Sequence, residues 1–117
     1  MANPNLLQAT SCTLLHSSGN VSTSQANIVS GASSNTVRKI TSLYVCNTST
    51  STITLSVCRA NPGGSWWIVR NLEIPTKATI NVITKESPMI LNESYYTLQG
   101  VASASGLIYN VDYEDYS

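Results

Sequence analysis

Few residues of this sequence could carry out chemistry, and they lie far apart. The one histidine, His16, stands beside Ser17 and Ser18, and a base beside a hydroxyl is the beginning of a nucleophilic site. Such a site also needs a third group that orients the base, and triads are assembled in space rather than along the chain. No residue suggests itself as that third member. We therefore expect His16 to be a surface or packing residue, and we expect no enzymatic activity.

Metal binding requires three or four ligands at suitable spacings, which the three cysteines and the single histidine do not provide. Acidic residues gather near the carboxyl end at Asp112, Glu114 and Asp115. These carboxylates either complete a calcium site, meet a basic partner, or form the solvated end of the last strand. We favour the solvated end, and we expect no metal and no cofactor.

Trp66 and Trp67 form the most informative pair of side chains. Adjacent residues of a strand point to opposite faces, so both rings share the core only if a bulge intervenes. One ring is therefore expected on the outer face. There it could anchor an interface or offer a flat surface on which a sugar stacks, unless it lies under a loop or along the sheet edge. We favour the interface.

The composition limits the classes of partner. Charged residues are 10% of the chain, far below the usual quarter, and the formal net charge is zero. Without a basic patch the protein cannot neutralise phosphates, so we expect no nucleic-acid partner. A surface without net charge favours association with proteins instead. The amino end lacks the basic and apolar segments of a signal peptide, and no apolar run reaches the roughly 18 residues of a membrane helix. We therefore expect synthesis in a cytoplasm and no membrane association.

Short alternating runs rich in Val, Ile, Thr and Tyr recur along the chain, separated by clusters of Gly, Pro, Asn and Ser. This pattern predicts an all-β fold, an antiparallel β-sandwich of jelly-roll or Ig-like type with about seven or eight short strands. Residues 36–117 are assigned to the sandwich domain. Residues 1–35 form either its first strands or an arm that pairs with a neighbouring subunit, and neither alternative is favoured.

The clearest predicted unit is a hairpin between residues 37–46 and 52–59. A register that places Leu43 opposite Val57 and Val45 opposite Leu55 gathers these aliphatic side chains and Ile53 on one face. In this register Cys46 and Cys58 lie four positions apart along the ladder, roughly 13 Å, whereas a disulfide needs Cα atoms within about 7 Å. We therefore expect both to be free thiols.

Later segments are predicted to be extended as well: residues 65–70, 78–84 and 89–91. Residues 71–75 are expected to interrupt the first of them, with Pro75 at an edge or at a strand start. Residues 95–101 and 107–113 are expected to form a second hairpin, whose register is undefined because apolar residues occupy both faces.

The outer face of the predicted first hairpin is unusually apolar. It offers Ile40, Tyr44 and Cys46, whereas an antiparallel sheet with one solvated face should alternate between apolar and polar residues. We therefore expect a second covered face. The candidate interface residues are Ile40, Tyr44, Trp66, Trp67 and Tyr95.

Five segments between Val37 and the carboxyl end carry a family resemblance: residues 40–49 (ITSLYVCNTS), 52–57 (TITLSV), 69–75 (VRNLEIP), 90–95 (ILNESY) and 104–114 (ASGLIYNVDYE). In this order they resemble a family of small virion proteins of tailed bacteriophages, especially phages of cyanobacteria and other marine bacteria. Such proteins have an Asn-Thr-Ser turn between two strands and a Gly-Asp corner before the penultimate strand, which residues 92–94 replace here. The resemblance implies a β-sandwich component of the virion, on capsid or tail, and carries over no catalytic residues.

We therefore predict a non-enzymatic structural protein of a tailed-phage virion, made in the host bacterial cytoplasm. It is expected to self-associate as a homo-oligomer and to dock on the particle as a capsid decoration or cement protein, or as a neck or tail accessory protein. Its further expected partners are other virion proteins, namely the major capsid protein or neck and tail proteins. The alternative is a carbohydrate- or receptor-binding β-sandwich module that uses an exposed Trp.

Overall fold

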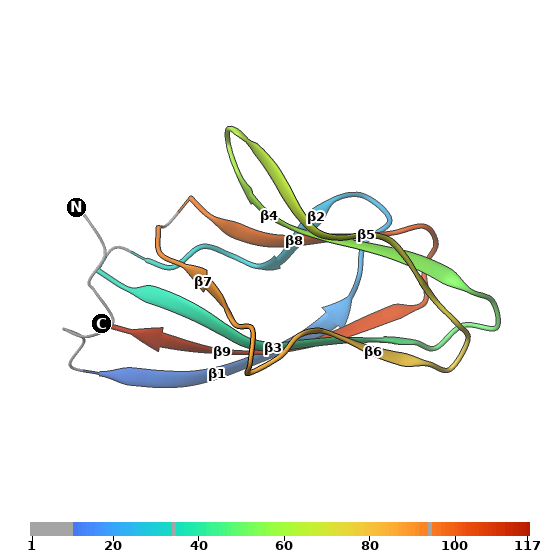
Figure 1. Cartoon of the computed structure of the whole chain (residues 1–117), viewed down its shortest axis with the longest axis horizontal. Helices are drawn as coiled ribbons and strands as arrows, with labels where there is room; N and C mark the ends of the chain where they lie inside the picture. The colour runs from blue at the N-terminus through green and yellow to red at the C-terminus, as the bar shows by residue number, and fades with distance from the viewer. Residues whose placement is uncertain (1–10, 34, 94) are drawn as a thin grey trace.

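A computed structural model describes residues 11–33, 35–93 and 95–117 of the chain. Their nine strands form two antiparallel sheets packed face to face, which confirms the predicted all-β sandwich (Figure 1). Sheet A contains, in spatial order, β1 (Cys12–Asn20), β9 (Leu107–Tyr116), β3 (Val37–Asn47) and β6 (Thr79–Ile83), and β7 (Met89–Leu91) also pairs with β3. Sheet B contains β2 (Ala26–Val29), β8 (Thr97–Ala102), β4 (Ile53–Asn61) and β5 (Gly64–Ile74). In the described ranges, no helix has the length and apolar character needed to cross a membrane.

The core lies between the two sheets and is built from alternate residues of the central strands. Leu43 of β3 and Val111 of β9 are completely buried in sheet A, and Leu55 and Val57 of β4 are completely buried in sheet B. Because side chains of a strand alternate between its faces, the residues between these ones point away from the core.

The prediction of a hairpin between residues 37–46 and 52–59 is wrong, because these two strands do not pair with each other. β3 pairs with β6, β7 and β9 in sheet A, whereas β4 pairs with β5 and β8 in sheet B, so residues 48–52 cross from one sheet to the other. The aliphatic pattern correctly gives the buried face of β4 and that of β3 from Leu43 onward. However, that pattern does not distinguish two strands that are neighbours in one sheet from two strands that face each other across the core.

The crossing between β3 and β4 is held by Asn47, whose side chain is completely buried. Its Nδ2 donates to the carbonyl oxygens of Ser51 (2.8 Å) and Ile74 (2.9 Å). Its Oδ1 accepts from the backbone N–H of Ser49 at 2.9 Å and from Ser49 Oγ at 2.7 Å. One amide group thus shapes the turn and ties it to the end of β5, which explains why a polar residue is buried at this point.

Ile40, predicted on the outer face, is instead completely buried in the core. The register of β3 against β9 shifts between Ile40 and Ser42, so Thr41 is an extra residue in β3. This β-bulge lets Ile40 and Leu43 face the core although they are three residues apart, an odd spacing that strict alternation would place on opposite faces. Tyr44 keeps its predicted outward position and is 36% exposed.

Two other local predictions are also wrong. The second predicted hairpin does not form, because β8 belongs to sheet B and β9 to sheet A. The strand is not interrupted at residue 71 as predicted, because β5 continues to Ile74, with register shifts against β4. Asn71 takes a positive φ of 54° there, a conformation that Asn tolerates better than most residues.

The amino-terminal region contributes two strands to the sandwich. β1 lies at one end of sheet A and β2 at one end of sheet B, whereas residues 1–10, the rest of the predicted arm, lie outside the described residues. All three cysteines are free thiols, as predicted for Cys46 and Cys58. The reason differs from the predicted one, since Cys46 belongs to sheet A and Cys58 to sheet B.

Candidate functional site

The two tryptophans lie on opposite faces of β5, as adjacent strand residues should. Trp67 pairs with Cys58, and Trp66 pairs with Arg59, whose other partner is the core residue Leu98. Cross-strand partners share a face, so Trp66 lies on the core side of sheet B and Trp67 on its outer side.

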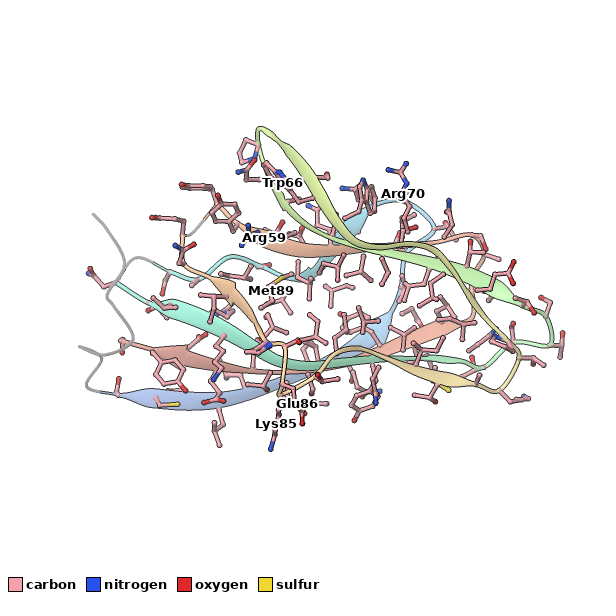
Figure 2. The ribbon with its side chains drawn as sticks, viewed as in Figure 1. Arg59, Trp66, Arg70, Lys85, Glu86 and Met89 are labelled. Carbon is pink, nitrogen blue, oxygen red and sulfur yellow. The ribbon has the colours of Figure 1, made fainter. Side chains whose placement is uncertain are left out.

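The more exposed of the two rings is the one on the core side. Trp66 is 51% exposed, whereas Trp67 is half-buried and carries the guanidinium group of Arg70 at 4.6 Å from its ring. The tip of the β4–β5 hairpin projects away from sheet A, so sheet A does not cover the core-side face of this tip (Figure 1). Figure 2 shows Trp66 near this tip. An interface anchor was expected on the outer face, and the structure offers it on the other one.

Further aromatic residues lie at the same end of the sandwich. The guanidinium carbon of Arg59 lies 4.9 Å from the centre of the Tyr96 ring, and the rings of Tyr95 and Tyr96 are 5.0 Å apart. Tyr95 is 51% exposed. These contacts hold a cation and two rings in place, an arrangement common at protein interfaces. We call Arg59, Trp66, Tyr95 and Tyr96 the aromatic end.

A second feature is a groove of about 410 Å³ on the outer side of sheet A. It lies between β1, β9 and the turn of residues 84–87, and Figure 2 shows Lys85 and Glu86 of this turn on the side of sheet A away from sheet B. We call it the β1–β9 groove. Its lining residues are Leu14, Leu15, His16, Thr41, Lys85, Asp112, Tyr113 and Glu114.

Asp112 is the partner of His16 that the sequence did not suggest. Nδ1 of His16 lies 2.6 Å from Oδ1 of Asp112, and Ser42 Oγ donates to Oδ2 at 3.1 Å. The hydrogen bond from His16, and after it the one from Ser42, lowers the pKa of Asp112. Ser42 therefore bonds the carboxylate rather than the imidazole, so it is not activated as a nucleophile. Both His16 and Asp112 are about half exposed, and the pair is not enclosed as an acid–base site would be.

The other two terminal carboxylates are also held by partners within the chain. Tyr116 donates to Glu114 at 2.5 Å, which lowers the pKa of Glu114 and raises that of Tyr116. Asp115 accepts two hydrogen bonds from Arg38, at 2.8 and 2.9 Å, and raises the pKa of Arg38. Among the described residues, no group of three or more His, Cys, Asp or Glu side chains could hold a metal ion.

The β1–β9 groove could not be found from the sequence because it depends on the pairing of the first and last described strands. Ninety-six positions separate His16 from Asp112, and only the β1–β9 register brings them together. Alternation does place Asp112 and Glu114 on one face of a strand, which is the one signal available beforehand.

Comparison with known proteins gives the fold alone. No family model matches the chain, and no curated protein matches it. The chain is similar in structure to a chain described under the words "Bacillus endospore appendages form a novel family of disulfide-linked pili". The match has a TM-score of 0.54 at 13% sequence identity and covers 100% of this chain and 96% of the other. The antiparallel β-sandwich is thus shared with a pilus protein of Bacillus endospores.

Proposed function

We propose that this chain is a non-enzymatic structural subunit that self-associates and docks on a larger particle, the virion of a tailed phage. One observation carries the proposal: large apolar side chains are half exposed or more on a molecule without net charge. Leu14, Trp66 and Tyr95 are 76%, 51% and 51% exposed. A neutral protein that exposes such groups gains free energy when another protein covers them, at about 25 cal/mol per Å² of apolar surface.

The placement of the polar groups supports a structural role. The His16–Asp112 pair is open to solvent and holds no hydroxyl nucleophile, and Asp115 is engaged by Arg38. Each of these side chains stabilises contacts between strands, as expected of a protein whose task is to keep its shape. The location on a phage rests on the resemblance of residues 40–114 to virion proteins, since the likeness to the pilus chain concerns the fold.

Light scattering coupled to size-exclusion chromatography, run with reductant, tests self-association. We expect a mass above that of one chain, and a lower mass when Trp66 and Tyr95 are both changed to Ala. Thr23→Ala, an exposed change in the β1–β2 connection, is the control and should leave the mass unaltered. A wild-type monomer at high concentration would contradict the proposal.

Mass spectrometry of purified phage particles tests the location. The protein should be present in reproducible copy number, high for a capsid decoration protein and low for a neck or tail protein. Its absence from washed particles would overturn the virion assignment and leave self-association to be judged separately.

The second candidate function, a carbohydrate- or receptor-binding module, is favoured by one observation. Trp66 exposes half of its ring beside Arg59, and sugars bind where an aromatic face lies near hydrogen-bond donors. Glycan-array binding that is lost in Trp66→Ala and kept in Trp67→Ala would establish it. Absence of glycan binding, together with loss of assembly in Trp66→Ala, would favour the structural subunit.

A further inference from the structure

Five strands lie at the edges of the two sheets, and four of them carry features that protect an edge from pairing, among them β7 with its three residues. β2 has four residues and a register shift, and β6 has five residues and a register shift. β5 is longer, but its register shifts twice and it carries Arg70 and Glu73. Short length, bulges and charges are the usual devices that stop sheet edges from pairing with other chains.

β1 has none of these devices. It is nine residues long, pairs with β9 without any register shift, and contains no Asp, Glu, Lys or Arg. None of the described residues pairs with its other side. Figure 1 shows β1 at the margin of its sheet, beyond β9. A long, regular and uncharged edge is a template for strand addition.

The backbone groups that point to this free edge can be identified. Ser11 and Ser117 exchange both backbone hydrogen bonds, and Val21 N–H donates to the Leu107 carbonyl. In an antiparallel ladder such bonded pairs alternate along the strand, so the odd-numbered residues of β1 bond β9. The even-numbered residues direct their N–H and C=O groups to the free side: Cys12, Leu14, His16, Ser18 and Asn20.

The side chains of the same residues lie on the outer face of sheet A. Leu14 pairs with Glu114 and His16 with Asp112, on the face that carries the β1–β9 groove. Leu14 is 76% exposed, the highest value among the large hydrophobic residues that the structure describes. A strand added to this edge would therefore satisfy backbone groups and cover Leu14 together.

We infer that β1 pairs antiparallel with β1 of a second copy about a two-fold axis, which joins the two A sheets into one. The occupant follows from charge: a two-fold axis brings a strand against a copy of itself, so a charged strand would bring like charges together in one short interface. β1 contains no Asp, Glu, Lys or Arg that could cause this repulsion. The inference rests on the proposed function, since it names a second surface, besides the aromatic end, through which copies associate.

The register follows from the strand itself. The outer faces of the two A sheets form one continuous face only when even-numbered residues of one β1 lie opposite even-numbered residues of the other β1. The pairing that uses all nine residues sets His16 against His16 on the axis, Leu14 against Ser18 and Cys12 against Asn20 of the second copy. Every edge-directed N–H and C=O of β1 then has a partner. Shifting the second copy by two residues would bring Cys12 opposite Ser18 and leave Asn20, at the end of the strand, without a partner in β1.

Native Cys12 offers a test of both the pairing and the register. Asn20→Cys and Ser18→Cys are compared in a protein whose half-buried Cys46 is changed to Ser, under mild oxidation at low concentration. Bonded pairs of an antiparallel ladder have Cα atoms about 5.5 Å apart, within disulfide range, and diagonal neighbours are about 7–8 Å apart. The Asn20→Cys protein should form covalent dimers faster than the Ser18→Cys protein. Adding Cys12→Ser should abolish this difference.

Faster cross-linking of Ser18→Cys would overturn the register, and the absence of covalent dimers in both variants would overturn the pairing. Leu14→Lys supplies a noncovalent test, because it replaces the apolar side chain that the pairing would cover with a cation on the edge strand, which is a usual device against strand addition. The dimer dissociation constant should rise about tenfold or more, whereas Ser24→Lys in the β1–β2 connection should leave it unaltered. In a protein that also carries Trp66→Ala and Tyr95→Ala, assembly that persists in Leu14→Lys refutes the β1 interface alone, and a monomeric wild type refutes the proposed function as well.

Discussion

Replacing Asn47 by Ala should destabilise the protein by about 3 kcal/mol. The side chain is completely buried, and its amide satisfies the carbonyl of Ile74 inside the protein and that of Ser51 in the turn. A buried group left without a partner costs about 1–3 kcal/mol, and each lost neutral hydrogen bond contributes about 0.5–1.5 kcal/mol. Four hydrogen bonds of the Asn47 side chain are lost, one of them buried, and together they add up to about 3 kcal/mol.

Urea unfolding followed by tryptophan fluorescence, with all proteins at one concentration, measures this loss. The control is Asn81→Ala on the exposed side of β6, which should change the free energy of unfolding by no more than about 0.5 kcal/mol. Asn47→Asp should be at least as damaging as Asn47→Ala at neutral pH, because a carboxylate would face the two carbonyl oxygens. A loss below about 1 kcal/mol for Asn47→Ala would refute the view that this amide holds the crossing between the sheets.

Three further predictions concern the polar and sulfur groups. Because Arg38 and Asp115 form a bidentate, mostly buried ion pair, a double-mutant cycle with Ala should give a coupling energy of about 1–3 kcal/mol. A coupling energy within error of zero would contradict the view that this ion pair stabilises the fold. The pKa of Asp112 is lowered in the folded state, so the stability that its carboxylate contributes is complete above the unfolded pKa of about 3.9 and is lost as pH falls through the folded pKa. On acidification the wild type should therefore lose more stability than Asp112→Asn. Equal losses measured by urea unfolding would refute this prediction. Burial raises the pKa of the Cys58 thiol, so a thiol reagent should label Cys58 slowly in the native protein. Labelling of Cys58 should be faster in Trp67→Ala, because Trp67 is its cross-strand neighbour. Rapid labelling of Cys58 in the wild type would show that this thiol is accessible.

The sequence pattern predicted the layers of the fold better than its topology. Alternation correctly identified the buried face of β4 and that of β3 from Leu43 onward. It could not decide which strands are neighbours, because a buried face looks the same whether its contact lies in the same sheet or across the core. The bulge at Thr41 has no signature in the residue types, and it moved Ile40 from the expected surface into the core.

The candidate surfaces were predictable only where local rules decide them. Adjacent residues on a strand had to diverge, so one tryptophan had to leave the core. That the more exposed ring belongs to Trp66 depends on the tip of the β4–β5 hairpin projecting away from sheet A, which is a property of the whole fold. The exposure of the β1 edge likewise follows from strand order, since the sequence of β1 does not say which strand becomes its neighbour.

We propose that this neutral β-sandwich associates with copies of itself as a structural subunit. Sedimentation velocity of the reduced wild-type protein over a wide range of concentrations tests this self-association without any substitution. We predict species of two or more chains whose share rises with concentration, and a shift toward single chains in Leu14→Lys. A single species with the mass of one chain at every concentration would contradict the claim.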